Sequence, residues 1–191
     1  MARTEGDLKH RIDAAALHLF AERGADATPV PMIAERAGVA VGSLYRYYGN
    51  KEELVARLYA ENYARLADEL RRVAARQVSA HDKIAAMVRF ICNYFDQEWD
   101  LARFLLLEQH VRLKSYAGAG NPVDIVHEVL AEGMRRGEVR RLDGMLATAL
   151  VMGPVIQAAT FRTYGRLTSP LSDAAKEIAE GIWAAVAKQR D

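Results

Sequence analysis

Only one cysteine, Cys92, occurs in the 191 residues of the chain. A single thiol cannot close a disulfide within the chain, and it cannot form a cysteine-rich zinc site. The first seven residues carry several charges and no apolar core, so we expect no secretory signal peptide. These absences together favour a protein of the reducing cytoplasm.

Long uncharged runs are also scarce, and residues 144–161 form the one stretch that approaches the length of a bilayer span. This stretch is interrupted by Gly153-Pro154 and contains the polar Gln157. We therefore interpret it as a helix that is buried on most sides of a soluble bundle, and we expect no membrane partner.

The sequence lacks sustained alternation of polar and apolar residues, which is the pattern of half-buried strands. Almost every segment instead has helical periodicity, and this predicts an all-α fold of about nine helices. The predicted helices span residues 4–23, 29–37, 41–47, 51–76, 80–96, 101–113, 121–136, 143–166 and 171–188.

A net charge of +1 gives no general sign of a nucleic-acid partner, so a local basic patch has to be sought. The stretch from Arg36 to Lys51 is one, because it contains three bases and no acid. Within it, two short predicted helices are joined by residues 37–40, a glycine-containing turn of helix-turn-helix length. The second helix begins with small residues and has Arg46 one turn later, while Leu44 points inward. This pattern suits a recognition helix in the major groove of DNA.

Lys51 lies in the first turn of the next predicted helix, where the helix dipole disfavours a cation. A DNA phosphate at this position would satisfy both the lysine and the free amides of the helix terminus. The alternative is an ordinary solvated lysine, and the neighbouring Ser43, Tyr45 and Tyr47 favour the contact with DNA.

Residues 33–54 read IAERAGVAVGSLYRYYGNKEEL, and residues 14–24 read AAALHLFAERG. In these motifs the segment 8–58 resembles the DNA-binding domain of the tetracycline-repressor (TetR) family. The resemblance implies two classes of DNA contact: phosphate contacts by Thr28, Ser43, Tyr45, Tyr47 and Lys51, and positions near base edges for Val41, Gly42 and Arg46.

Two residues depart from the family pattern. Ala40 stands where the family often has a serine or threonine that caps the recognition helix, so this helix is expected to begin without that cap. Tyr48 stands where phenylalanine is usual, and its hydroxyl therefore needs a partner or a path to water.

The resemblance implies two domains, an N-terminal three-helix helix-turn-helix domain (1–50) and a C-terminal helical bundle (51–191) for effector binding and dimerisation. The last two long helices are apolar over wide faces and contain many small residues, which favours a four-helix seam between two copies. The alternative is that these faces pack on the protein's own bundle. The candidate interface residues are Leu150, Pro154, Ala158, Phe161, Ile178, Ile182 and Trp183.

Polar and aromatic residues scattered among apolar ones in the central helices suggest a cavity for a small molecule. The candidate ligand-binding residues are Phe95, Trp99, Arg103, His110, His127, Met152 and Gln157. The mixture favours an apolar or aromatic compound with one polar or anionic group. A cationic compound stays open because Asp96, Glu98, Asp100 and Glu108 lie nearby in sequence, and each residue taken singly also fits an ordinary core or surface position.

Signs of catalysis are few. Asp124 and His127 have the spacing used in di-iron bundles, but those sites need a second such motif and further glutamates, which we do not find. The chain has no phosphate-binding loop, no nucleophile elbow and no metalloprotease pair. We therefore predict no catalytic residue, no metal site and no cofactor.

The sequence as a whole predicts a homodimeric, cytoplasmic transcriptional repressor that binds a palindromic operator in double-stranded DNA and is released by a small molecule. One alternative is a DNA-binding regulator without a small-molecule effector. The other is a helical-bundle enzyme or metal protein whose N-terminal helices resemble the family by coincidence.

Overall fold

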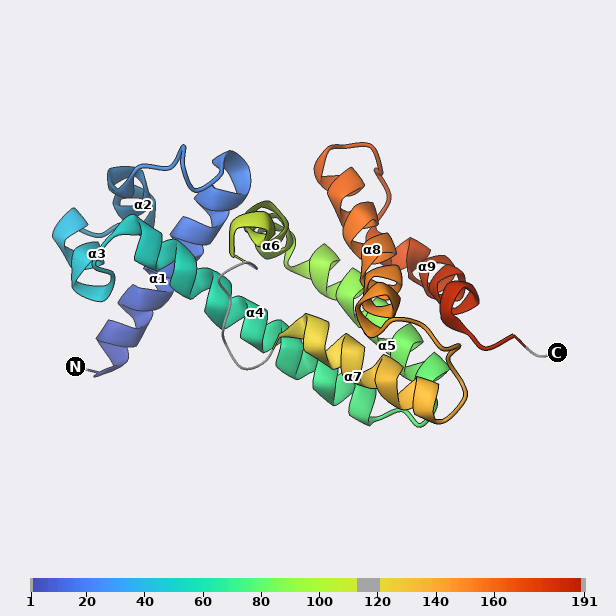
Figure 1. Cartoon of the computed structure of the whole chain (residues 1–191). Coiled ribbons are helices and arrows are strands. Elements are labelled where there is room, and N and C mark those ends of the chain that lie inside the picture. The colour runs from blue at the N-terminus through green and yellow to red at the C-terminus, as the bar shows by residue number, and fades with distance from the viewer. Residues whose placement is uncertain (1, 113–120, 190–191) are drawn as a thin grey trace. The chain divides into compact units, whose positions relative to one another are not determined.

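The computed structural model describes residues 2–112 and 121–189. Within these ranges the chain forms nine α-helices and no strand, apart from one isolated bridge between Val139 and Ala187 (Figure 1). The all-α prediction is therefore confirmed. The helices are α1 (Ala2–Arg23), α2 (Val30–Ala37), α3 (Val41–Tyr47), α4 (Lys51–Ala75), α5 (Ala80–Gln97), α6 (Trp99–Arg112), α7 (Pro122–Arg135), α8 (Gly144–Thr163) and α9 (Leu171–Val186).

The chain divides into two compact units. The first contains residues 1–62 and 100–117, and the second contains residues 63–99 and 118–191. Two helices, α4 and α6, therefore contribute residues to both units. The functional division at residue 50 stays a prediction.

The core of the first unit joins helices that are far apart in sequence. Phe20 of α1 stacks on Phe104 of α6 with ring centroids 5.9 Å apart, and Tyr59 of α4 meets Phe104 edge-on at 6.4 Å. All three rings are at most 1% exposed. The helix α6 thus completes the core of the unit that contains the helix-turn-helix, which local sequence patterns did not predict.

In the second unit, α5 packs chiefly against α9, and α7 packs against α8. The unit is closed near its C-terminus by backbone hydrogen bonds from Arg140 N to Val186 O (2.9 Å) and from Lys188 N to Glu138 O (3.0 Å). These bonds hold the segment after α7 beside the end of α9.

Several predicted helix ends differ from the structure by one to three residues. The first helix begins at Ala2 rather than Thr4. The second begins at Val30, and its N-cap is Pro29, so the Thr28 hydroxyl does not cap it. The eighth ends at Thr163, because Gly165 takes a left-handed conformation (φ +68°) and Arg166 N donates back to Phe161 O.

Within the described residues, one helix is long and apolar enough to cross a membrane by length and composition alone, and this helix is α8. Only 28% of its apolar window is buried inside the single chain. The expectation of a helix buried on most sides is therefore wrong for one copy, because α8 leaves Met145, Leu146 and Phe161 exposed.

Candidate DNA-binding surface

The turn between α2 and α3 depends on Gly38. This residue adopts φ +66°, and the chain closes the end of α2 through Gly38 N to Glu35 O (3.0 Å) and Val39 N to Ala34 O (2.9 Å). A Cβ atom at Gly38 would lie 2.7 Å from the Arg11 guanidinium. The left-handed backbone conformation favours glycine, so the turn predicted from this glycine forms as expected.

The recognition helix α3 has little to stabilise it alone. It spans Val41–Tyr47, and its N-cap Ala40 makes no side-chain hydrogen bond, as the sequence predicted. A helix of this length is marginal in water. It is held by packing, since Leu44 has no exposed surface and the following Tyr48 is 1% exposed.

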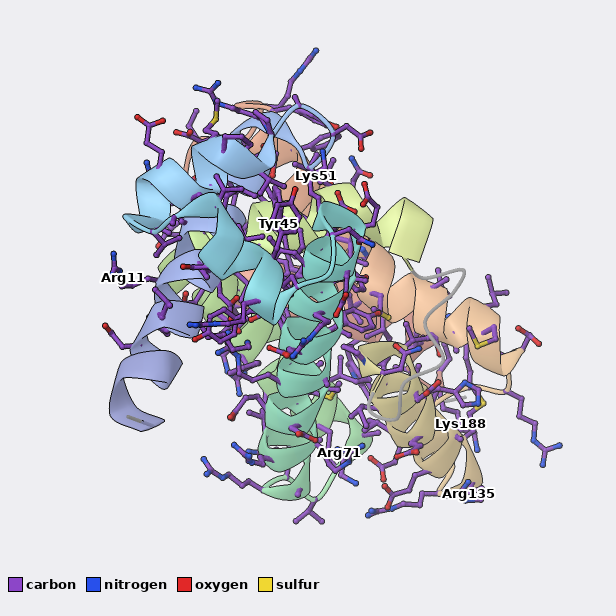
Figure 2. The ribbon with its side chains drawn as sticks, turned by 90° about the vertical axis from the view of Figure 1, so that its left-hand side faces the viewer. Arg11, Tyr45, Lys51, Arg71, Arg135 and Lys188 are labelled. Carbon is purple, nitrogen blue, oxygen red and sulfur yellow. The ribbon has the colours of Figure 1, made fainter. Side chains whose placement is uncertain are left out.

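The outer face of α3 is open to solvent. Val41 and Tyr45 are 37% and 49% exposed, and Gly42 and Arg46 are exposed as well. The Arg46 guanidinium lies 5.5 Å from the centre of the Tyr47 ring, at a distance that permits a cation–π contact. Figure 2 shows Tyr45 together with Lys51 at the start of α4.

Tyr48 has the hydrogen-bond partner that its hydroxyl requires. The hydroxyl donates to Asp13 of α1, and Lys9 binds the other carboxylate oxygen of Asp13 at 2.7 Å. Burial raises the pKa of Tyr48 well above its usual range, and the hydrogen bond to Asp13 raises it further. Tyr48 therefore stays a neutral donor at any physiological pH.

Lys51 makes two hydrogen bonds within the protein that the sequence did not predict. Its ammonium donates to Ala25 O at 2.9 Å and to Asp26 O at 3.3 Å, so it holds the loop between α1 and α2. The ammonium has three hydrogens, and these carbonyls accept two of them. The remaining one is the hydrogen that a phosphate would have to accept.

Thr28 is placed differently from the other predicted phosphate contacts. It has no exposed surface, and its hydroxyl donates to Gly24 O at 2.8 Å. A buried hydroxyl that already has an acceptor cannot reach a phosphate without rearrangement. Thr28 in this structure therefore stabilises the α1–α2 loop, and we correct its predicted role.

The start of α4 is capped as predicted. Asn50 Oδ1 accepts from Glu53 N at 2.7 Å. The Glu53 carboxylate in turn accepts from Gly49 N at 3.0 Å, one residue before the expected position of a capping box. This reciprocal cap fixes the helix on which Lys51 stands.

The predicted ligand-binding residues fall in both units. Arg103 and His110 belong to the first unit, and the side chain of His110 lies outside what the structure describes. The remaining five candidates belong to the second unit and are Phe95, Trp99, His127, Met152 and Gln157. The predicted ligand site therefore stays a prediction.

Of these candidates, Arg103 has the most unusual environment. Its Nε atom is buried and has no hydrogen-bond partner among the described residues. Phe95 is 6% exposed, whereas Gln157 is exposed on the same face of α8 as Pro154 and Phe161. Gln157 is therefore oriented like the candidate dimer residues rather than like an inward-facing ligand contact.

Trp99 and His127 each have a neighbour inside the second unit. The Arg162 guanidinium lies 4.4 Å from the Trp99 ring centre. His127 lies against the first turn of α8, where a Cβ at Gly144 would come within 2.4 Å of its ring and Thr148 Oγ1 lies 3.4 Å from its Nδ1. The roles of both side chains in a ligand site stay predictions.

The acids that left a cationic ligand open are partly engaged within the protein. Asp96 binds Arg162 and accepts from the backbone amides of Leu171 and Ser172 at the start of α9. Asp100 lies 2.7 Å from His18. Within the described ranges, no group of three or more His, Cys, Asp or Glu side chains is placed to hold a metal ion.

The predicted dimer residues also differ in their exposure. Pro154 and Phe161 are exposed, and Leu150, Ala158 and Ile178 are partly exposed. Ile182 is 1% exposed and belongs to the core of its own unit, so its place in an interface is corrected. Trp183 is partly exposed and contacts His81 edge-on at 5.1 Å, and its place in an interface stays a prediction.

The sequence reasoning missed the polar contacts that hold α3. Arg11 Nη2 donates to Ala37 O at 2.5 Å and to Gly38 O at 2.9 Å. Arg57 of α4 lies 5.1 Å from the Tyr48 ring centre. The only signal for any of these in the sequence was the need of the Tyr48 hydroxyl for a partner.

Comparison with known proteins agrees with this geometry. Residues 12–58 match the family model described as bacterial regulatory proteins, tetR family. Across 76% of the chain and 78% of the relative, the sequence is 27% identical to the fatty acid metabolism regulator protein of Bacillus subtilis (strain 168). A shorter stretch of 43 residues is 51% identical to the HTH-type transcriptional repressor KstR2 of Mycobacterium tuberculosis, covering 22% of each chain.

Solved structures share the fold over nearly the whole chain. A TetR family transcription regulator from Marinobacter aquaeolei VT8 has a TM-score of 0.84 at 17% identity and covers 99% of this chain and 100% of that one. The transcriptional regulator FadR from Bacillus subtilis, in complex with stearoyl-CoA, has a TM-score of 0.79 at 22% identity, with coverages of 92% and 98%. The helix-turn-helix, the matching family model and these relatives together support a DNA-binding transcriptional regulator of the TetR family.

Proposed function

We propose that the protein is a homodimeric repressor that binds a palindromic operator through α3 and releases it when a small molecule binds. The observation that carries this proposal is the open outer face of α3, where Val41, Gly42, Tyr45 and Arg46 are exposed around a buried Leu44. No acid occurs from Arg36 to Lys51, so the phosphate backbone meets no local repulsion.

Specific roles follow from the exposure of the side chains. Arg46, Val41 and Gly42 would lie near base edges, and Gly42 lets the DNA approach the backbone closely because no side chain stands there. Ser43, Tyr45, Tyr47 and Lys51 would bind phosphates, Lys51 through the one ammonium hydrogen that its two carbonyl acceptors leave. Because phosphate contacts position the protein and base contacts specify the sequence, these two groups should differ when mutated.

The second copy would cover the exposed face of α8. The exposed apolar side chains of this face include Leu146, Pro154 and Phe161, and Gln157 is exposed among them. A large apolar patch on a soluble protein marks an interaction site, and a two-fold pair of such helices would bury both patches. Two copies would also present two recognition helices to the two halves of a palindrome.

For the effector, we propose an acyl-coenzyme A or a similar long-chain acid. The support is the name of the Bacillus subtilis relative, the stearoyl-CoA in the FadR structure, and the buried Arg103 Nε without a partner among the described residues. An anionic group of the ligand would give this donor an acceptor, and leaving it without one is costly.

The test begins with operators selected from a random duplex pool by the wild-type protein. Stearoyl-CoA, stearate and coenzyme A are then titrated into the complex while operator binding is followed by fluorescence anisotropy. We expect stearoyl-CoA to weaken operator binding about tenfold or more, a typical coupling between two sites, and coenzyme A alone to have no effect. Operator binding that no acyl compound alters would instead support a regulator with another effector or none.

A further inference from the structure

We infer that a short stretch of α1, residues 9–13, positions the recognition helix by holding the chain at both of its ends. Before α3, Arg11 donates to Ala37 O and Gly38 O. After α3, Asp13 accepts from the hydroxyl of Tyr48. The inference rests on the DNA-binding role of α3 and names the residues that set its orientation.

The first contact lies at the turn. The last carbonyls of a helix have no partner within the helix, and a cation there also interacts favourably with the helix dipole. Arg11 gives the end of α2 both a hydrogen-bond donor and a positive charge. Its Nη2 atom lies 2.5 Å from Ala37 O and 2.9 Å from Gly38 O. Gly38 leaves room for it, since a Cβ there would lie 2.7 Å from that nitrogen. The turn that aims α3 is thus tied to α1.

The second contact lies at the C-cap. Tyr48 is the C-cap residue of α3, and its ring is 1% exposed. The ring lies 5.9 Å from Lys9 Nζ and 5.1 Å from the Arg57 guanidinium, so cations from α1 and α4 face it. Lys9 also binds Asp13 at 2.7 Å and Glu61 of α4 at 3.4 Å. A charged acceptor inside this cluster holds the hydroxyl more firmly than a neutral one would.

These contacts matter because α3 itself is so weakly anchored. It has seven residues and no side-chain cap, and Leu44 is its one buried side chain. A helix anchored by a single side chain can rotate about that side chain. Two hydrogen-bonding points, one beyond each end, remove this freedom and preorganise the helix for the groove.

The test separates positioning from stability and from phosphate contact. Tyr48→Phe removes only the hydroxyl, and Asp13→Asn keeps an acceptor oxygen while Asp13→Ala removes it. We expect Tyr48→Phe and Asp13→Ala to weaken binding to the selected operator about tenfold, as for a lost buried hydrogen bond to a charged group. The affinity of these variants for a random duplex should stay within about twofold of the wild-type affinity, because the phosphate contacts are unchanged. Asp13→Asn should retain most of the operator affinity.

Arg11 requires variants that separate its charge from its geometry. Arg11→Lys keeps the charge but loses the forked guanidinium, and Arg11→Met loses both. We expect both to lower the ratio of operator to random-duplex affinity, with the salt dependence unchanged in Arg11→Lys. Arg23→Met, at an exposed arginine in the last turn of α1, is the matched control and should leave the ratio unchanged.

A second readout needs no DNA. In the free protein, amide hydrogen exchange of residues 44–48 should become several-fold faster in Tyr48→Phe, while exchange in α9 stays the same. Unchanged exchange and an unchanged affinity ratio would overturn the inference. If only Arg11→Met lost affinity for DNA, and its salt slope were smaller by about one, Arg11 would be a phosphate contact instead. A wild-type protein that binds no duplex would contradict the proposed function, and the exchange measurement would still decide the inference.

Discussion

The helices α3 and α8 both leave much of their surface open, but the surfaces differ in kind. α3 is seven residues long, has no side-chain cap and is held by side chains from other helices. α8 has twenty residues, and its own N-cap Asp143 accepts from Leu146 N at 2.9 Å. The open face of α3 carries an arginine and a tyrosine, whereas that of α8 is apolar. The first suits a hydrated, charged partner such as DNA, and the second suits another protein surface.

The largest effect is expected where α3 depends on a single side chain. Leu44→Ala should lower the free energy of unfolding by about 2–5 kcal/mol and should abolish operator binding, because a fully buried leucine is lost from a marginal helix. Chemical denaturation and anisotropy measure the two effects. Val155→Ala, at a buried position of α8, should destabilise the protein but leave operator binding by the remaining folded protein intact. Wild-type operator affinity in Leu44→Ala would show that α3 is anchored by other contacts.

The next effect tests the apolar face of α8. Phe161→Asp places a charge on that face, where the phenylalanine is 49% exposed in the single chain. The free energy of unfolding per monomer should hardly change, but the dimer should dissociate about thirtyfold more readily or worse, as at interface hot spots. Sedimentation at several concentrations measures the dissociation.

The control for this variant is Lys176→Asp, at an exposed position of α9. It should leave the dimer unchanged. A wild-type protein that sediments as a monomer would contradict the proposed dimer. Binding of the wild type, but not of Phe161→Asp, to phospholipid vesicles would show that the face covers a membrane instead.

A smaller effect compares two glycines of α8. Gly144→Ala would place a Cβ 2.4 Å from the His127 ring, so we expect a loss of about 1–3 kcal/mol from overpacking. Gly153→Ala meets nothing within 4 Å apart from its chain neighbours, but Pro154 follows it and disfavours a Cβ-bearing residue in the helical conformation. This offsets the higher helix propensity of alanine, so we expect the stability to change by less than about 1 kcal/mol. Thermal unfolding distinguishes them, and equal melting temperatures would mean that His127 moves aside freely.

An effect of similar size concerns the two cations of the DNA-binding surface. Arg46→Ala should cost about 1–3 kcal/mol on the selected operator and relax its sequence preference. Lys51→Ala should weaken all duplexes alike and lower the salt slope by about one unit. It should also lower the melting temperature, since Lys51 holds Ala25 O and Asp26 O. A lower melting temperature with an unchanged salt slope would leave Lys51 a purely structural role.

Local signals in the sequence predicted the elements that depend on neighbouring residues. Gly38 marked the turn, Asn50 and Glu53 marked the start of α4, and the periodicity identified all nine helices. Gly165 would have marked the end of α8 correctly, because a glycine two residues beyond the last helical residue supplies the left-handed conformation that closes it.

Contacts between distant segments could not be predicted in this way. The hydrogen bonds from Lys51 to Ala25 O and Asp26 O join residues that are 26 and 25 positions apart in the sequence. Arg11 looked like any exposed residue of α1, and the apolar character of Ile182 served the protein's own core as well as it would have served an interface. A pattern of polarity shows which face is apolar, but it does not show what covers that face.

The discontinuous first unit has a consequence for the exchange of parts between related regulators. Its core includes Phe104, which reaches it from α6 after the chain has already entered the second unit. A chimera joined at a single point after residue 62 would take α1–α3 from one protein and α6 from the other. Phe20 and Tyr59 would then pack against a foreign helix in place of Phe104. New operator specificity is therefore obtained more safely by grafting the exposed side chains of α3 than by replacing the whole segment before residue 62. Selection during the divergence of such proteins acts under the same constraint, because recombination at one crossover separates residues that must change together.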